Sequence, residues 1–79
     1  MSSIKADRRI DLSGACCPVP IMETNKTIKT MQAGEVLEVI STDVGSHMDI
    51  PAWCRRTGNA LLHQEAANGV YRYLIRRKS

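Results

Sequence analysis

Asn68-Gly69 is the feature that most constrains the fold, because it lies between two runs of residues that favour β-strands. Asn-Gly is the strongest short signal for the two-residue turn that joins antiparallel strands. The flanking runs, Leu61 to Glu65 and Val70 to Arg77, are therefore expected to pair as a hairpin. The end of the chain is thus predicted to add strands, and no helix, to the fold.

Two strand patterns and two helix patterns alternate upstream of this hairpin. Arg8 to Leu12 alternates polar and apolar residues and stops at Ser13-Gly14, while Glu35 to Thr42 is rich in β-branched residues. A helix is expected from Pro18 to about Gln32, with Gly34 as its left-handed C-terminal cap. The apolar stripe of this helix consists of Ile21, Thr24, Ile28 and Met31.

The second helix is predicted from Ser46 to Thr57, and Gly58-Asn59 ends it. Ser46 and Asp49 resemble a capping box. Pro51 lacks a donor that a helix begun at Ser46 would use, so either the first turn has 3₁₀ character or the helix starts near Asp49. Its inward face is expected to hold Ile50, Trp53, Cys54 and Thr57.

The element order is therefore βαβαββ in a chain of 79 residues. The economical arrangement is an α+β two-layer sandwich, in which two helices cover one face of a four-stranded mixed sheet. The length allows a single domain, residues 1–79, whose polar residues 1–7 are expected to be frayed. Phe is absent, so aliphatic side chains must fill a thin core.

The composition argues against several classes of protein. No apolar run approaches the roughly 18 residues that span a bilayer, and no signal-peptide core opens the chain, so a cytoplasmic protein without membrane association is expected. Three cysteines are too few for a disulfide scaffold, and His47 and His63 lack zinc-ligand spacing. A Gly-rich phosphate loop is absent as well. We therefore expect neither a metal nor a cofactor.

Cys17-Pro18-Val19-Pro20 is the segment that carries chemistry. Pro18 suits the first helical position and Pro20 is tolerated in the first turn, so the prolines stiffen the helix start and make Cys17 its expected N-cap. Free N–H groups and the helix dipole would then lower the pKa of Cys17 and favour the thiolate, which is the form that attacks sulfur. The alternative is a small buried residue at a helix start.

This segment and several others resemble the TusA/SirA-like sulfur carrier family, over nearly the whole chain from residue 8 to residue 78. The further matching segments are Lys26-Thr27-Ile28, Met31, Gly34-Glu35-Val36-Leu37-Glu38-Val39, Thr42-Asp43, Asp49-Ile50-Pro51 and Tyr71-Arg72-Tyr73-Leu74-Ile75-Arg76. The resemblance implies a two-layer α/β sandwich with a persulfide carried on Cys17. Two positions depart from the family pattern: Cys16 is commonly not a cysteine, and Val44 replaces a frequent proline.

The resemblance also implies what such a protein does. Sulfane sulfur arrives from a cysteine desulfurase or a rhodanese-type donor and passes to a downstream acceptor protein, for tRNA thiolation, sulfur oxidation, or molybdenum-cofactor or selenium metabolism. The chain is then a sulfurtransferase-type relay protein rather than a stand-alone enzyme. Cys16 is a secondary thiol that resolves the persulfide or shields Cys17 from over-oxidation, or it is a partly buried small residue.

Two other functions stay open. The basic end of the chain, with Arg72, Arg76, Arg77 and Lys78, suits an RNA-binding module, although few aromatic residues are present and direct nucleic-acid binding is not favoured. A thiol redox protein would instead cycle a disulfide of Cys17 with Cys16 or Cys54, but the vicinal pair is geometrically poor. Tyr71 and Tyr73 are expected to cover the outer sheet surface, and Trp53 and Cys54 to pack in the core.

A docking surface is predicted from the positions of four cations. Lys26 and Lys29 fall on the outward side of the first helix, and Arg55 and Arg56 near the end of the second. If the helices pack side by side, these residues make a basic face beside the sulfur. Such a face would steer acidic partners and speed their encounter, while adding little affinity.

Overall fold

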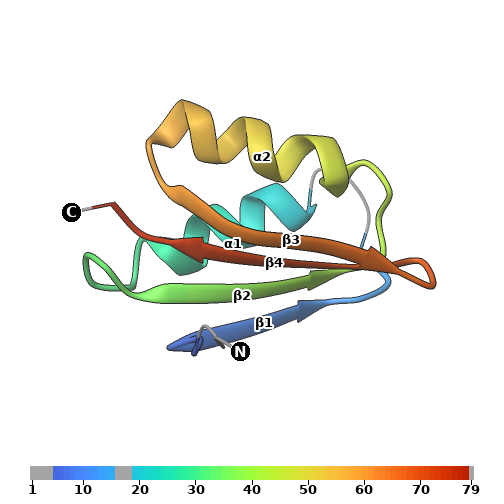
Figure 1. Cartoon of the computed structure of the whole chain (residues 1–79), viewed down its shortest axis with the longest axis horizontal. Helices are drawn as coiled ribbons and strands as arrows, with labels where there is room; N and C mark the ends of the chain where they lie inside the picture. Colours follow the sequence, from blue (N-terminus) through green and yellow to red (C-terminus); the bar gives the residue numbers. More distant parts are fainter. Residues whose placement is uncertain (1–4, 16–18, 79) are drawn as a thin grey trace.

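The computed structural model describes residues 5–15 and 19–78. In these residues the chain forms β1 (Arg8–Leu12), α1 (Val19–Ile28), β2 (Val36–Ser41), α2 (Ser46–Thr57), β3 (Ala60–Ala67) and β4 (Val70–Arg76). The strands make one 4-stranded mixed sheet in the order β1-β2-β4-β3, and both helices lie on one face of it (Figure 1). The predicted βαβαββ sandwich is confirmed.

Strand direction gives the molecule two distinct ends. β1 is parallel to β2, with Leu12 opposite Ser41, whereas β4 is antiparallel to both of its neighbours. A parallel pair needs a crossover connection, which α1 supplies. The carboxyl ends of β1 and β2 and the starts of both helices therefore lie at one end, on the right of Figure 1, and both helices finish at the other. We call these the thiol end, because the segment with Cys17 leads into α1, and the distal end.

The hairpin forms where Asn68-Gly69 predicted it. Both residues have positive φ, 54° and 77°, as the favoured two-residue turn requires. The first strand of the pair is longer than expected, because it begins at Ala60 and continues to Ala67. A bulge between Leu61 and His63 shifts its register against β4. The bulge lets Leu61 pack against the core while His63 lies on the opposite face.

The core lies between the helices and the sheet and consists of Ile28, Met31, Leu37, Val39, Ile50, Trp53, Cys54, Tyr73 and Ile75. The core positions predicted for Trp53 and Cys54 are confirmed. The expectation that the tyrosines cover the outer sheet surface is wrong. Tyr73 is fully buried beside Ile75, and Tyr71 packs against the same cluster. Side chains two residues apart on a strand point to the same face of the sheet. Tyr71, Tyr73 and Ile75 therefore all point to the face that the helices cover.

α1 ends at Ile28, earlier than the predicted Gln32. The N–H groups of Thr30 and Met31 bond the carbonyls three residues back, at 3.0 and 3.1 Å, so the chain tightens into 3₁₀-type turns. Gly34 has a φ of 85°, but it belongs to the turn that leads into β2 and does not cap the helix. Met31 stays buried although it lies beyond the helix.

α2 has the predicted bounds but a different cap. Its N-cap is Gly45, which has no side chain to cap the helix, so Ser46 lies inside the helix and not at the N-cap position expected of it. The Gly45 carbonyl accepts from both Met48 and Asp49, at 3.1 and 3.0 Å, and this shared bond gives the first turn the 3₁₀ character that was one of the two options for accommodating Pro51. Gly58, with a φ of 82°, closes the helix by donating to the Cys54 carbonyl.

A charged row crosses the sheet face opposite the helices. Arg9 pairs with Glu38, Glu38 with Arg72, Arg72 with Glu65 and Glu65 with His63. Val36, Ile40 and Leu74 are buried on this same face, because the stems of long charged side chains cover apolar surface. The row thus shields the open side of a thin, two-layer domain.

Asp7 contacts the neighbouring strand just before β1 begins. Its N–H donates to the Val36 carbonyl and its carboxylate accepts from the Val36 N–H, both at 2.8 Å. These two bonds connect the residue before β1 to the start of β2.

Candidate functional site

Cys16, Cys17 and Pro18 lie outside the described residues. The N-cap position and the thiolate character of Cys17, and the role of Cys16, accordingly stay predictions. The described residues on either side, Ala15 and Val19, fix where this segment leaves the sheet and enters α1. The geometry of the site is therefore given by these flanking residues.

The loop that precedes the segment is tethered to the sheet. Gly14 has a φ of 85° and donates its N–H to Thr42 Oγ1 at 2.8 Å, which links the end of β1 to the end of β2. Ser13 donates both its N–H and its hydroxyl to Asp11, at 3.0 and 2.6 Å, and these bonds lower the pKa of the Asp11 carboxyl. The chain thus reaches Ala15 from a loop held by short polar contacts.

The start of α1 bears the second half of the Cys-Pro-x-Pro motif. Val19 is the first residue of the helix, and Pro20, in its first turn, is buried. A proline there removes no intrahelical bond, since the first N–H groups of a helix have no partner within it. Pro20 therefore anchors the amino end of α1 against the body of the protein without weakening the helix.

Exposed apolar side chains gather at the thiol end: Val19, Met22, Val44 and Met48 are between 39% and 77% exposed. Val19 and Met22 come from the first turns of α1, and Val44 and Met48 from the turn before α2 and its first turn. Sequence reasoning missed them. The available signal was that Met22 and Met48 are apolar residues outside the inward stripes of their helices. Flexible methionines suit a surface that must pack against more than one partner.

The turn between β2 and α2 completes this end. Asp43 donates its N–H to Ser41 Oγ at 3.1 Å, and its carboxylate accepts from the Gly45 N–H at 3.3 Å. Asp43 also lies within the resembling Thr42-Asp43 pair, which the bond from Gly14 to Thr42 connects to the loop before Cys17. The carboxyl ends of the two parallel strands are thus joined beside the start of α1.

Cys54 lies in a setting opposite to the one predicted for Cys17. It is 2% exposed in the core beside Ile50 and Trp53, and burial raises the pKa of its thiol to about 11. A neutral, buried thiol is inert toward sulfur transfer and disulfide exchange. The thiol redox hypothesis that pairs Cys17 with Cys54 is therefore not supported by the structure.

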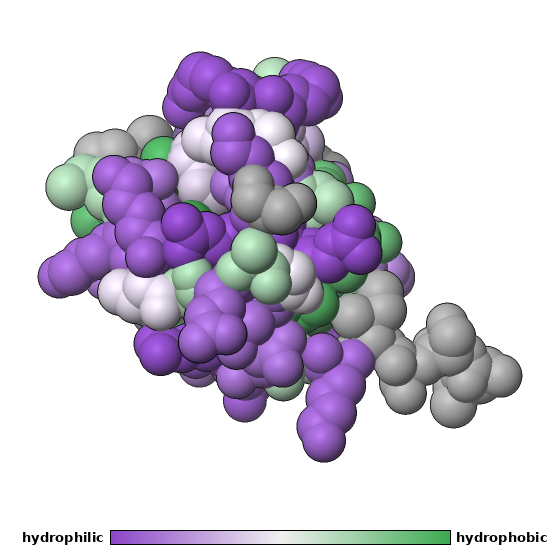
Figure 2. Space-filling view, turned by 90° about the vertical axis from the view of Figure 1, so that its left-hand side faces the viewer, coloured by the Kyte–Doolittle hydropathy of each residue, from purple (hydrophilic) through white to green (hydrophobic). Residues whose placement is uncertain are grey.

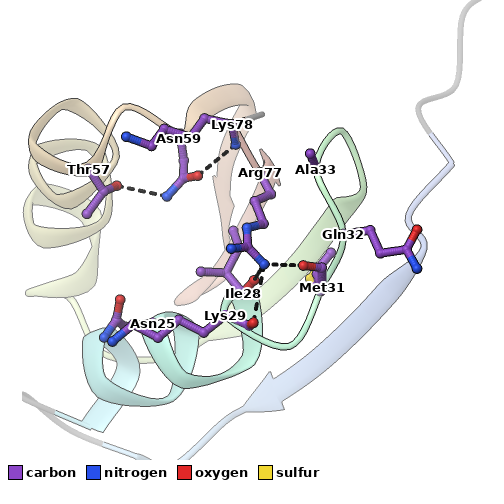
Figure 3. A pocket seen from close by; sticks show the side chains of 10 residues that line it. All are labelled: Asn25, Ile28, Lys29, Met31, Gln32, Ala33, Thr57, Asn59, Arg77 and Lys78. Atoms are coloured by element: carbon purple, nitrogen blue, oxygen red, sulfur yellow. Dashed lines mark hydrogen bonds between the residues drawn. The ribbon is translucent and has the colours of Figure 1, made fainter.

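The four cations of the RNA hypothesis do not form one continuous basic surface, because two of them are engaged within the protein. Arg72 is paired with Glu38 and Glu65 on the outer sheet face. Arg77 turns its guanidinium to the carbonyls that end α1, of Ile28, Lys29 and Met31 (Figure 3). Only Arg76 and Lys78 remain as exposed cations of that set.

The four predicted docking cations, Lys26, Lys29, Arg55 and Arg56, are all exposed. They lie in the last turns of α1 and α2 or just beyond, toward the distal end. With a rise of about 1.5 Å per residue, Lys29 lies roughly 15 Å along the axis from the start of α1. Lys29 lines a hollow at the end of α1, and Arg56 lines one between the helices nearer the thiol end. The basic face is thus set back from the thiol end.

In the part of the chain that the structure describes, His63 lies away from the thiol end, and neither a metal-ligand group nor a membrane span is found. His63 is on the outer sheet face and contacts Glu65 at 2.9 Å. Residues 5–15 and 19–78 contain no group of three metal-ligating side chains close enough to hold an ion. Nor is either of the helices in this part of the chain long and apolar enough to cross a membrane.

The fold and the Cys-Pro-x-Pro segment together define the class, a two-layer α+β domain with a cysteine leading into its first helix. The profile of the family described as Sulfurtransferase TusA matches residues 8–77, and the chain belongs to this family of sulfur carriers. The structure is also similar to the SirA-like protein of Desulfitobacterium hafniense, with a TM-score of 0.78, 25% identity, and coverage of 91% of this chain and 99% of that one.

Similar full-length relatives carry the same description. The chain is 41% identical over 71 residues to the sulfur carrier protein TusA of Allochromatium vinosum, covering 90% of this chain and 93% of that protein. Identity to the TusA of Pseudomonas entomophila is 39% over 79 residues, covering 100% and 99%. Other relatives are longer: the chain spans 35% of an Aquifex aeolicus protein, to which it is 46% identical over 69 residues, and 40% of one from Bacillus subtilis.

Proposed function

We propose that this protein carries sulfane sulfur as a persulfide on Cys17 in the cytoplasm, taking it from a donor protein and passing it to an acceptor protein. The Cys17 thiolate attacks the outer sulfur of a donor persulfide, R–S–SH. A new S–S bond forms, the donor S–S bond breaks, and the donor leaves as R–S⁻, so that Cys17–S–SH results. An acceptor thiolate then takes the outer sulfur and returns Cys17 to its thiolate form.

Membership of the TusA family over residues 8–77, a range that includes Cys17, is the observation that carries the proposal. The described flanks support it. The loop to Ala15 is tethered, Pro20 anchors the start of α1, and exposed apolar side chains surround the thiol end. The donor is proposed to be a cysteine desulfurase or a rhodanese-type protein, and the acceptor a further sulfur-transfer protein.

The experiment is mass spectrometry of the intact chain after incubation with a cysteine desulfurase and cysteine. We expect the mass of one sulfur atom to be added to the wild type and to Cys54→Ala, and none to Cys17→Ser. Cys16→Ser separates the two neighbouring thiols, and it should still be loaded. Loading of Cys17→Ser at another residue would overturn the assignment, and loss of loading in Cys16→Ser alone would move the persulfide to Cys16.

A further inference from the structure

Three hollows run together along the junction of the two helices and on to the distal end. The largest, about 490 Å³, lies where α1 ends and includes Lys29, Asn59 and Lys78 (Figure 3). It shares Asn25 and Thr57 with a second hollow nearer the thiol end. It shares Arg77 and Lys78 with a third hollow, which lies where β3 starts and β4 ends. Because neighbouring hollows share residues, they form one continuous depression, which we call the interhelix groove.

The lining of the interhelix groove is uneven in polarity. Toward the thiol end it is apolar, with Ile21, Met22 and Trp53. Arg56 borders this same hollow. The other two hollows carry four cations: Lys29, Arg76, Arg77 and Lys78. None of the described residues that line it is an aspartate or a glutamate. Figure 2 looks onto the distal end and shows that hydrophilic side chains dominate there.

Part of this lining is held in place before any partner arrives. The Asn59 amide donates to Thr57 Oγ1 at 2.8 Å, and its oxygen accepts from the Lys78 N–H at 2.9 Å. Arg77 is fixed by the carbonyls at the end of α1. Fixed polar groups need little ordering when a ligand binds, so less affinity is lost to entropy.

We propose that the interhelix groove binds an extended acidic segment of a partner protein, with an apolar residue of that segment at Ile21 and Met22 and its carboxylates along Lys29, Arg56 and Lys78. The proposal deepens the function proposed above and rests on it for the partner's identity as a sulfur donor or acceptor. Opposite charges along a groove set the register and speed the encounter of the two proteins. Because the basic part of the groove lies toward the distal end, a partner segment bound there does not occupy the thiol end.

A protein segment suits the groove better than RNA does. Proteins that bind single-stranded nucleic acid stack bases on exposed aromatic rings. Trp53 is 3% exposed, Tyr73 is fully buried, and Tyr71 packs against the core. The groove therefore offers cations without a stacking platform. An apolar hollow at one end with cations beyond it matches a peptide that has an apolar anchor followed by carboxylates.

The test is titration of the full chain with a fluorescein-labelled peptide, a leucine pair followed by a run of glutamates, monitored by anisotropy at low and at physiological salt. The groove variant Lys29→Glu/Arg56→Glu is compared with Lys26→Glu/Arg55→Glu, which makes the same charge change on the same two helices outside the groove. We expect the groove variant to bind at least about tenfold more weakly than wild type, and the control variant to change affinity by less than about twofold. Circular dichroism melts check that both variants fold.

Each alternative has its own outcome. Equal losses in the two variants would reduce the effect to net charge and overturn the groove. Tighter binding of an oligouridylate than of the peptide would indicate a nucleic-acid site and overturn the proposal. Binding of the glutamine version of the peptide with equal affinity would do the same, because carboxylates would then play no part. Since binding is measured without any sulfur transfer, failure here is distinct from failure of Cys17 to load.

Discussion

At the scale of single residues, burial sets Cys54 apart from the cysteine proposed to carry sulfur, Cys17. Cys54 packs between Ile50 and Trp53 at 2% exposure, where an ionised thiolate would have to give up its hydration. Such a thiol would not compete for donor sulfur with Cys17, the proposed carrier. The position favours a residue that is small and apolar when neutral, which cysteine is.

The pH dependence of stability tests this burial. Burial raises the pKa of Cys54 from 9.0 to about 11, so the folded state holds the thiol proton more tightly than the unfolded chain does. The contribution to stability is fully present below pH 9.0, and it is lost as the pH rises toward 11, because the unfolded chain ionises first. At about 1.4 kcal/mol per pKa unit, the free energy of unfolding should fall roughly 2–3 kcal/mol further in wild type than in Cys54→Ala.

Urea unfolding of both proteins across this alkaline range measures the difference. All other side chains are common to the two proteins, so subtracting the two curves isolates the effect of Cys54. Parallel curves for wild type and Cys54→Ala would mean that Cys54 is not buried as a neutral thiol.

At the scale of elements, the end of α1 is stabilised by a residue far away in the sequence, Arg77. Arg77 Nη1 donates to the carbonyls of Ile28 and Lys29 at 3.1 and 3.2 Å, and to that of Met31. The Ile28 carbonyl also accepts from the Met31 N–H, so Arg77 adds a charged donor to the turn that closes α1. A cation there also complements the negative end of the helix dipole. Arg77 follows β4 directly, so one side chain ties the last strand to the first helix.

Replacing this side chain should destabilise the fold. Arg77→Met keeps the apolar stem but leaves buried or half-buried carbonyls without a charged donor, which costs about 1.5–3 kcal/mol. The neighbouring Arg76 is exposed, so Arg76→Met serves as the control and should change stability by less than about 0.5 kcal/mol. Urea denaturation compares the two variants. Equal stabilities would show that the guanidinium does not hold α1 in solution.

Local signals in the sequence predicted most elements but not how they meet. Asn68-Gly69 located the hairpin, and Gly58-Asn59 located the end of α2, because turn and cap chemistry acts over a few residues. The end of α1 depends on Arg77, which lies 49 residues from Ile28, and no local pattern contains that contact. Whether Tyr73 is buried likewise depends on which side of the sheet the helices cover, and that is not encoded near Tyr73 in the sequence. The prolines and cysteine of the motif indicated the site, whereas the interhelix groove arises only when α1 and α2 pack together.

Charge is divided between the two ends at the scale of the whole molecule. The helices finish among Lys29, Arg55 and Arg56 at the distal end, and Arg76 and Lys78 follow from β4. The thiol end carries Asp11, Asp43 and Asp49. A donor or acceptor with an acidic surface is therefore drawn to the distal end and turned relative to the thiol before contact. Such steering acts on the rate of encounter and weakens as salt shortens the Debye length.

The loading rate of Cys17 should reveal this steering. Reversing two distal cations, in Arg55→Glu/Arg56→Glu, should slow persulfide formation by an acidic desulfurase about three- to tenfold at low salt, with little change in the thermal midpoint because both side chains are exposed. At about 1 M salt the Debye length falls to about 3 Å, so the two rates should converge. The comparison variant Lys5→Glu/Arg8→Glu makes the same change in net charge at the distal end too, but at the start of β1 instead of at the end of α2. Greater slowing in Arg55→Glu/Arg56→Glu would assign steering to the helix ends, and equal slowing would assign it to charge not confined to them. An unchanged rate at low salt would leave presentation of Cys17 alone to explain recognition.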